Sequence, residues 1–481
     1  MGTIENQMAQ EILELKNTIR FLLLKLEKLE EANELLKAAN ELLKEENETL
    51  RRKLGETSAN SHKPPSSDGY GKKPAIEKEK GGKKGGQEGH KGDTLKKVES
   101  ADKIEIHHAC SCSECGRAFN ESEVEGIIGS RQVFDIPTPK LEVTEHQIGV
   151  IKCCGKIHQG EYPAGVESPV QYGSRIKALS VFLSIDCKIS FKRVSKLLSD
   201  LYGCKYNEST TESSIKRCYE LLEPTEYYIL DRIQESKIAH FDETGNRVNG
   251  KLHWVHVICT TYFTYMFVDE KRGHEAIGGI KSILQEYMGC AVHDCWGPYF
   301  KYKNASHALC NAHILRELQA LKDVGSKWAE QMHKLLLETY KETEKGTKRL
   351  ADGAYLIERY EIICENGLRE EPPPVYSSQN RPKNTKGRNL LLRLINHQQA
   401  VLAFAFDDDI PFTNNQAERD IRCTKVKQKV SGGFRTFKGA CFFARIQGVI
   451  STFRKHSLNI FSLFVDIFNL NFEPNIALQA K

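Results

Sequence analysis

Long hydrophobic runs are absent from this chain of 481 residues. No apolar segment of about 18 residues occurs, so the sequence predicts no membrane-spanning helix and no membrane partner. The first residues indicate a charged helix rather than a signal peptide. The chain contains 15 cysteines. Without a secretory signal, these predict thiols that are free or metal-bound in the reducing cytoplasm.

A strong excess of one charge is also missing. The formal net charge of +5 does not by itself indicate a nucleic-acid partner, so such a partner must be argued from local patterns. The length exceeds what one hydrophobic core supports and predicts about two to four domains.

A seven-residue repeat dominates positions 8–54. Leucine at every seventh position, with charged pairs at the flanking positions, predicts a coiled coil, and asparagine in the seam favours a homodimer. The alternative is a single amphipathic helix packed on its own core, which three seam asparagines fit poorly. The seam consists of Leu15, Leu22, Leu29, Leu36, Leu43 and Leu50, preceded three positions earlier by Ile12, Ile19, Leu26, Asn33, Asn40 and Asn47.

The next two segments are a linker and a cysteine cluster. Residues 55–103 are rich in Gly, Pro, Ser and Lys and predict a flexible basic linker, either a solvated tether or a phosphate contact. Residues 104–170 resemble a zinc finger, with Cys112 and Cys115 as one knuckle and adjacent Cys153 and Cys154 as an irregular second one. These four are candidate Zn²⁺ ligands, with Cys110 or His158 as possible substitutes. The alternative is a remnant finger held by packing alone.

Residues 171–236 predict a helical domain. Apolar helical faces occur at 175–185 and 191–201, Tyr202-Gly203 breaks the chain, and a third helix is predicted at 210–222. Lys216 and Arg217 lie on the third helix, an arrangement compatible with a helix-turn-helix DNA-binding domain. An ordinary helix pair joined through glycine is the alternative.

The segment from 237 to 304 predicts a sheet. A strand that contains Asp242 leads through Asn249-Gly250, a hairpin signal, to strands at 252–259 and 262–268. A helix is predicted at 275–287, followed by a strand that ends at Asp294. This order is that of a ribonuclease H-like fold, in which the first and fourth strands are adjacent.

Three acidic residues in this region suggest a metal site. Asp242 and Asp294 would meet on adjacent strands, and Glu418 follows helix-capping residues at 413–415, so it is expected in the first turn of a helix. Clustered carboxylates repel one another unless a cation such as Mg²⁺ or Mn²⁺ neutralises them. Glu243 should point to the opposite face of the strand. The alternative is that each carboxylate is simply solvated.

Residues 305–397 predict a helical insertion within this fold. Cys310 and His313 lie early in it and are interpreted as packing residues at a helix start rather than half of a metal site. A basic stretch with interleaved phenylalanines, suited to core packing or stacking, follows Glu418 and suits neutralisation of a DNA backbone. Its residues are Arg419, Arg422, Lys425, Lys427, Lys429, Arg435, Lys438 and Arg445, with Phe434, Phe437, Phe442 and Phe443.

Several motifs, in order, resemble the bacterial transposases of the insertion sequence 66 family. They are Lys-Pro-Pro-Ser-Ser-Asp at 63–68, Gly-Gly-Gln-Glu-Gly-His-Lys-Gly at 85–92, Arg-Gln-Val-Phe-Asp-Ile-Pro at 131–137, Asp-Glu-Thr at 242–244, Cys310-x-x-His313 with Arg316, and Asn-Asn-Gln-Ala-Glu-Arg at 414–419. The sequence departs from the family at Cys153-Cys154, where Cys-x-x-Cys is usual.

The resemblance implies a DDE transposase in which Asp242, Asp294 and Glu418 hold the metal ions. It also implies transposon-end DNA, target DNA and accessory proteins of the same element as partners. Two alternatives stay open: a dimeric DNA-binding protein without catalysis, and a hydrolytic nuclease of the same fold. The predicted architecture is multidomain α/β: a coiled coil at 1–54, a linker at 55–103, a zinc-finger-like segment at 104–170, a helical domain at 171–236, a ribonuclease H-like core at 237–304 and 398–460, its helical insertion at 305–397, and a C-terminal tail at 461–481.

Overall fold

The computed structural model describes residues 94–272, 286–344, 353–374 and 383–478, together with helical residues between positions 15 and 43. Most of the predicted linker and of the predicted helix at 275–287 lies outside the described residues. The chain divides into two compact units, residues 72–215 and residues 1–71 with 216–481. Among the described helices, none combines the length and apolar character needed to cross a membrane.

The unit at 72–215 is helical from Ser174 onward. Three helical segments are found where the sequence predicts them, although the first continues into a π-helical turn. Gly203 ends α3 in the left-handed conformation, with φ of 66°. A small core contains Val194, Leu198 and Tyr206. The elements are η2 (Glu121–Glu123), β1 (Val150–Cys153), β2 (Lys156–Gln159), α2 (Ser174–Val181), η3 (Phe182–Asp186), α3 (Phe191–Tyr202) and α4 (Glu208–Leu221), and the division between the units falls within α4.

A five-stranded mixed sheet forms the centre of the other unit. Its order is β5-β4-β3-β6-β7. The first three strands of this sheet, β3, β4 and β5, are antiparallel neighbours, whereas β6 runs parallel to β3 and β7 runs parallel to β6. The predicted adjacency of the first and fourth strands is therefore confirmed. The strands are β3 (Ile238–Val248), β4 (Lys251–Cys259), β5 (Thr264–Asp269), β6 (Cys290–His293) and β7 (Ser306–Leu309).

Turn chemistry explains the first hairpin. Asn249 and Gly250 connect β3 to β4, and both have positive φ, 48° and 76°. A two-residue hairpin turn of this type needs left-handed backbone at both positions, which Asn and Gly adopt most readily. This turn sets the register in which Val248 pairs with Lys251.

Two of the predicted domain boundaries need correction. The predicted insertion begins at 305, but residues 306–309 form β7, which belongs to the sheet. The predicted helical domain extends to 236, but α5 (Glu223–Gln234) packs on β5 and α14 of the sheet-containing unit. In both cases a short segment is assigned by its packing partners, which the local sequence pattern does not reveal.

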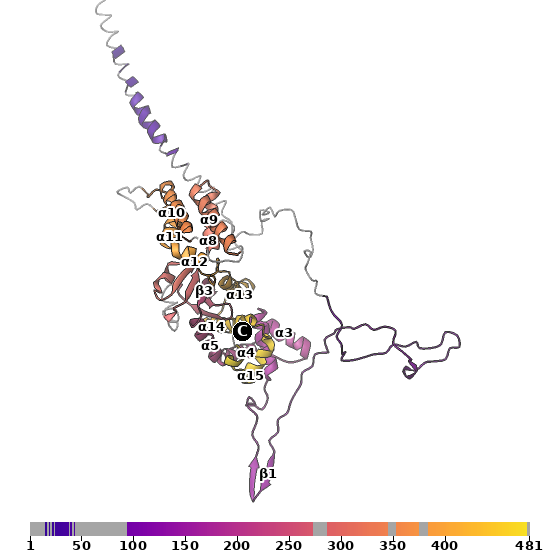
Figure 1. The fold of residues 1–481 in the computed structure, drawn as a ribbon. Coiled ribbons are helices and arrows are strands. Elements are labelled where there is room, and N and C mark those ends of the chain that lie inside the picture. The colour runs from indigo at the N-terminus through magenta and orange to yellow at the C-terminus, as the bar shows by residue number, and fades with distance from the viewer. Residues whose placement is uncertain are drawn as a thin grey trace, which may run out of the picture. The chain divides into compact units, whose positions relative to one another are not determined.

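Helices pack on the sheet and gather beyond its β7 edge. The helix α13 packs on β3 and β4, α14 packs on β5, and α12 packs on β7. Figure 1 shows α8 to α12 grouped together on one side of the sheet region. The helices are α8 (Asn311–Lys322), α9 (Lys327–Glu344), α10 (Gly353–Glu370), α11 (Lys386–Asn396), α12 (Gln398–Phe406), α13 (Asn415–Ser431), α14 (Phe437–Lys455), α15 (Ile460–Phe468) and α16 (Pro474–Ala477), with η4 (Gly297–Lys301) after β6.

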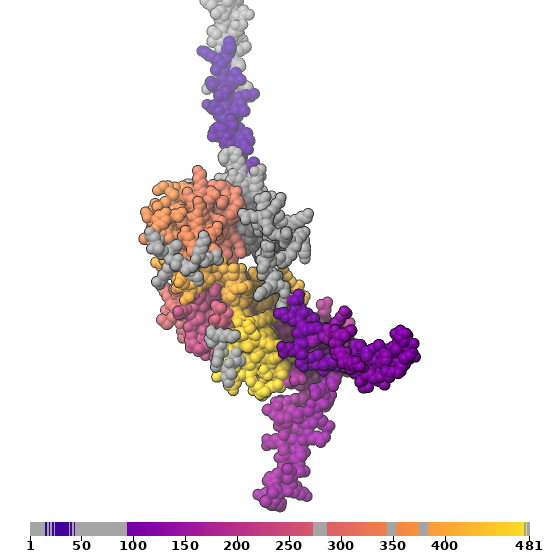
Figure 2. Space-filling model, turned by 45° about the vertical axis from the view of Figure 1, so that its right-hand side comes forward, coloured from indigo at the N-terminus to yellow at the C-terminus, as the bar shows by residue number. Residues whose placement is uncertain are grey.

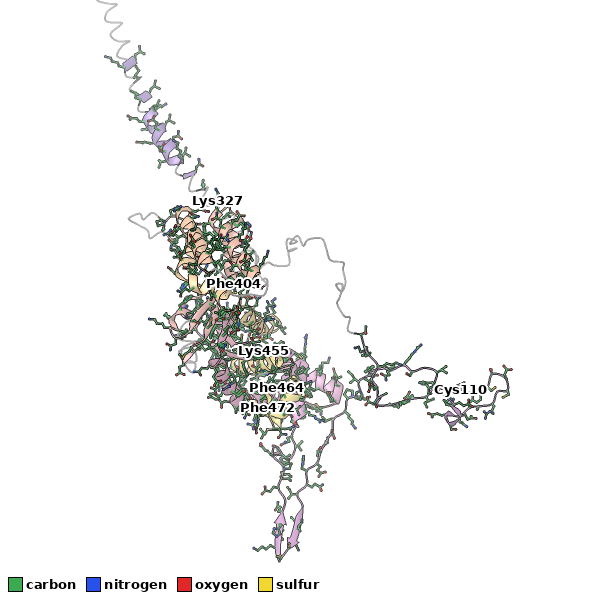
Figure 3. The ribbon with its side chains drawn as sticks, viewed as in Figure 1. Cys110, Lys327, Phe404, Lys455, Phe464 and Phe472 are labelled. Atoms are coloured by element: carbon green, nitrogen blue, oxygen red, sulfur yellow. The ribbon has the colours of Figure 1, made fainter. Side chains whose placement is uncertain are left out.

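The inserted helices have their own hydrophobic core. Trp328, Tyr360 and Leu391 are almost fully buried in it. On the surface, the insertion (orange) lies next to the helices that follow it in the chain (Figure 2). Phe404, labelled in Figure 3, packs edge-on against Phe412, with ring centroids 4.7 Å apart. This core connects the insertion to the segment that leads into α13.

Candidate active site

Three elements position the three acidic residues. Asp242 lies within β3, and Asp294 directly follows β6, the parallel neighbour of β3. Glu418 lies in the first turn of α13, as the sequence predicts, and α13 packs on β3. Carboxyl groups that are far apart in the sequence are thus carried by adjoining elements.

The pKa of Asp242 responds to the neighbouring carboxylates. Burial raises it well above its ordinary value, and the negative charges of Glu243, Asp294 and Glu418 raise it further. The backbone N–H of Glu243, which donates to Asp242 Oδ1 over 2.9 Å, opposes this rise. Asp242 is therefore a buried carboxyl group at which the repulsion of three other carboxylates converges.

Glu243, the next residue on β3, has cationic and hydroxyl partners instead. Its carboxylate accepts hydrogen bonds from Arg272 Nη2 over 2.7 Å and from Tyr299 Oη over 2.6 Å. The Arg272 guanidinium lies over the rings of Trp254 and Trp296, at 4.9 and 4.6 Å. The Glu243 carboxylate is thus held by protein donors, while burial and the negative charge of Asp294 raise its pKa.

Asn414 anchors the start of α13 to β3. Its side chain lies within 2.8 Å of His240 Nδ1 and donates to the Phe241 carbonyl over 2.7 Å. The sequence predicts Asn414 as a helix-capping side chain, but it accepts no N–H of the helix. The correction has a simple reason, because the amide is buried and its hydrogen-bonding groups are used on β3.

His240 and His293 have packing roles in the structure. Burial lowers the pKa of His240, whose ring contacts Asn414. Burial also lowers the pKa of His293 to about 3. The ring of His293 packs on Tyr299 and accepts the backbone N–H of Cys295 over 3.1 Å. Both rings therefore stabilise the elements that hold Asp242 and Asp294.

The donor set of the acidic residues fits a hard divalent cation. Asp242, Asp294 and Glu418 offer only oxygen ligands, which Mg²⁺ prefers. Glu418 Oε1 is buried, and among the described residues it has no hydrogen-bond partner. A buried carboxylate oxygen without a donor and a carboxyl group surrounded by negative charge are both features that a bound cation would satisfy.

Comparison with models of known protein families identifies the family of this chain. The model described as the Transposase IS66 family matches residues 169–441, more than half of the chain. The chain belongs to the IS66 transposase family. A second model, a family of unknown function (DUF6444), matches residues 5–96. The search of curated proteins found no match.

Membership implies transposition activity, a phosphoryl-transfer enzyme of the DDE class, DNA binding and use of a divalent metal. The five-stranded mixed sheet with its helices is consistent with the ribonuclease H-like core of such enzymes.

Most of the predicted DNA-binding residues of the IS66 domain are exposed. Arg422 and Lys425 lie four and seven positions after Glu418 on α13, and therefore on the same side of the helix. Lys425 Nζ donates to the Gly245 carbonyl over 3.3 Å. Burial lowers the pKa of Lys425, whereas the charge of Asp242 raises it. The exposed residues are Arg419, Arg422, Lys425, Lys429, Arg435 and Lys438, and Lys427 is half-buried.

Arg445 is a correction to the predicted basic surface. Its side chain is only 9 % exposed, donates to the Tyr219 carbonyl and pairs with Glu226 over 2.8 Å. The guanidinium also lies 3.7 Å from the centroid of the Tyr219 ring. Arg445 therefore connects α14 to α4 and α5. The interleaved phenylalanines are partly core residues as well, since Phe443 is buried and Phe434 packs beside it.

The predicted zinc ligands of the transposase are not assembled into one site. Cys112 and Cys115 lie on a tight turn, where the backbone N–H groups of Cys115 and Glu114 lower the pKa of the Cys112 thiol. Cys153 and Cys154 lie at the β1–β2 hairpin turn, where Cys154 has φ of 50°. Over residues 94–272, no three Cys, His or acidic ligand atoms lie within 4.8 Å of one another. Cys110, labelled in Figure 3, is exposed.

Lys216 and Arg217 lie exposed on α4 of the IS66 domain. Both approach Glu220, over 3.9 and 3.7 Å. Exposed pairs of this length are weak and easily exchanged for phosphate contacts.

Proposed function

We propose that this chain is a transposase that cuts DNA at the ends of its element and joins the exposed 3′ ends to target DNA. The observation that carries the proposal is the convergence of negative charge on buried Asp242, which includes the charges of Asp294 and Glu418. Such an arrangement is costly for folding alone and is common at functional sites.

Asp242, Asp294 and Glu418 would hold Mg²⁺ or Mn²⁺ through their carboxylate oxygens. When bound, two such ions stabilise the attacking and leaving oxygens of an in-line phosphoryl displacement. The remaining catalysis is positioning and charge stabilisation by the protein.

The chain's own side chains supply that positioning. Asn414 fixes the first turn of α13 against β3 and thereby determines the position of Glu418 in that turn. Glu243, held by Arg272 and Tyr299, connects β3 to the segments that follow β5 and β6. A DNA backbone that follows α13 away from Glu418 would meet Arg422 and then Lys425, whose charges neutralise phosphates.

Other parts of the chain would bring the DNA ends together. The seam leucines would pair two copies through a coiled coil, so that each copy processes one end. Lys216 and Arg217 on α4 would contact the backbone of the element's end. Accessory proteins encoded by the same element would be further partners of the chain.

The direct test uses labelled transposon ends, target plasmid and Mg²⁺. We expect Asp242→Asn, Asp294→Asn and Glu418→Gln each to lower cutting and joining by at least about 100-fold, because removal of a metal ligand should exceed the loss typical of outer partners. Binding of the labelled ends, measured by gel shift, should be retained.

The control is Asp323→Asn, an exposed residue at the end of α8, which should leave all three measurements unchanged. Full cutting by the three active-site variants would contradict the assignment. Cutting without joining would indicate a hydrolytic nuclease, and DNA binding without cutting would indicate a DNA-binding protein alone.

A further inference from the structure

A second group of potential metal ligands adjoins the carboxylates. Cys310 is the N-cap residue of α8, and His313 lies in its first turn. Their ligand atoms and that of Glu418 all lie within 4.8 Å of one another. Among the described residues, no other group of three or more Cys, His, Asp or Glu side chains is this close together. His313 Nδ1 lies 4.0 Å from Glu418 Oε1. Glu418 belongs to this group and also to the proposed carboxylate set, but the ligand atoms of Asp242, Asp294 and Glu418 do not all lie within 4.8 Å of one another.

The chemistry of this second set differs from that of the first. A thiolate and an imidazole favour Zn²⁺ and related transition ions, whereas carboxylates alone suit Mg²⁺. Ligands of a tetrahedral zinc ion lie roughly 3.5 Å apart, since Zn–N is about 2.0 Å and Zn–S about 2.3 Å. Side-chain movements of about 1 Å would close the present group around an ion.

Cys310 lies where two helices begin. The thiol is buried, and its sulfur accepts the backbone N–H of Asn414 over 3.1 Å. Asn414 is the N-cap residue of α13, so the starts of two helices meet at this sulfur. Burial and the charge of Glu418 raise the pKa of Cys310 to about 11, against the N–H groups of Asn414, His313 and Ala312, which lower it. A bound cation would displace the thiol proton, because the thiolate is the form that binds a metal ion.

We propose that Cys310, His313 and Glu418 bind a zinc-type transition ion, with water as a fourth ligand, and that this ion holds Glu418 away from Asp242 and Asp294. The second half of this proposal rests on the proposed function. Zinc binds nitrogen and sulfur ligands far more tightly than Mg²⁺ does. The occupied site would therefore keep the transposase in a state that does not cut.

Cobalt absorption tests the site without reference to catalysis. Co²⁺ is added to the full chain carrying Cys112→Ser, Cys115→Ser, Cys153→Ser and Cys154→Ser, which removes the other clustered thiols. We expect a sulfur-to-cobalt charge-transfer band and the visible bands of a tetrahedral ion, both abolished by Zn²⁺. The further change Cys310→Ser should remove the charge-transfer band, and His313→Asn should weaken Co²⁺ binding by at least about tenfold.

The matched control is Cys364→Ser, which removes a buried thiol of α10 in the inserted helical core and should leave the spectrum unchanged. Glu418→Gln provides a second variant that does not alter the thiol, and it too should weaken Co²⁺ binding by at least about tenfold. A charge-transfer band that persists in Cys310→Ser, or Co²⁺ affinity unaffected by His313→Asn and Glu418→Gln, would overturn the proposed site.

Inhibition by zinc tests the second half. In the labelled-end assay with Mg²⁺, we expect Zn²⁺ to inhibit cutting by the wild-type chain, with at least about tenfold more Zn²⁺ needed for Cys310→Ser, each measured against its own rate without zinc. Equal sensitivity of the two proteins would overturn the inhibitory role. Absence of cutting by the wild type in Mg²⁺ would instead contradict the proposed function, and the cobalt spectra would still decide the metal site.

Discussion

Asp242 and Glu243 are adjacent on β3 and both lie near the negative charge of Asp294, but Glu243 also has a cationic partner. Glu243 is neutralised by Arg272 and hydrogen-bonded by Tyr299. The charges that act most strongly on Asp242 are those of Glu243, Asp294 and Glu418, all of them negative. A carboxylate with a protein cation can serve as a structural link, whereas one surrounded by anions is stabilised by a proton or by a bound cation. The two roles follow from side-chain environment rather than residue type.

His256 on β4 makes the stability of this unit dependent on pH. Its ring is 2 % exposed and stacks on Phe267, with centroids 4.8 Å apart. Burial lowers its pKa from 6.5 to about 4. On acidification, the unfolded chain therefore binds a proton at this histidine near pH 6.5, whereas the folded chain binds it only near pH 4. The free energy of unfolding consequently falls as the pH falls through this range. At 1.36 kcal/mol per pKa unit, the loss reaches about 3 kcal/mol below pH 4.

The measurement is urea unfolding at pH 7 and pH 5, followed by the fluorescence of Trp254, Trp296 and Trp328. Between these pH values we expect His256→Gln to lose about 2 kcal/mol less than the wild type, because its unfolded state gains no proton at this position. His146→Gln, an exposed histidine of the other unit, should behave as the wild type does. An unchanged pH dependence in His256→Gln would contradict the expectation.

At the scale of elements, the attachment of α13 to β3 determines where Glu418 lies. Asn414→Ala would leave the Phe241 carbonyl without its donor and His240 Nδ1 without its partner. We expect a loss of about 1–3 kcal/mol in the free energy of unfolding, since buried polar groups without partners are costly. Cutting of labelled ends should fall as well, because the first turn of α13 would no longer be fixed.

Asn415→Ala is the matched control, because Asn415 is exposed and begins the same helix. It should retain both stability and cutting. If Asn414→Ala keeps wild-type stability and activity, the anchor has no role in holding Glu418.

Element-level features differ in how far sequence predicts them. Asn249-Gly250 specifies its turn by local chemistry, and alternation marks the strand that follows, so the hairpin is predictable from local sequence. The β3–β6 adjacency is predicted only through the strand order of a ribonuclease H-like fold. The contact between His240 and Asn414 joins residues 174 positions apart, and no local pattern contains it. The sequence alone predicts Arg445 as a surface cation, because it does not show that Glu226 of α5 pairs with it.

The length of an element also limits prediction. β7 has only four residues and lies between a loop and a long helical region, so its place at the sheet edge depends on pairing with β6. The group formed by Cys310, His313 and Glu418 arises because the segment after β7 and the start of α13 meet at that edge. Sequence spacing shows the first two ligands but gives no indication of the third.

At the scale of the whole molecule, the proposed chemistry needs two DNA ends, whereas the described part of one chain supplies one proposed carboxylate set, Asp242, Asp294 and Glu418. The N-terminal repeat offers a way to pair two sets. In the single chain, the seam residues Leu22, Leu29 and Leu36 are 55–67 % exposed on helical backbone. Burial of each leucine in a coiled coil would contribute roughly 1.5–3 kcal/mol. We therefore expect these faces to be covered by a second copy.

The change Leu29→Glu together with Leu36→Glu tests this pairing. It places like charges in the seam of both helices, so we expect monomers by light scattering where the wild type forms dimers. Leu35→Glu is the matched control, because Leu35 is exposed but lies outside the seam, and it should stay dimeric. The monomeric variant should still cut a single labelled end in Mg²⁺ but lose the coupled joining of two ends to one target. Coupled joining by a protein shown to be monomeric would mean that the two ends are brought together by contacts outside the N-terminal repeat.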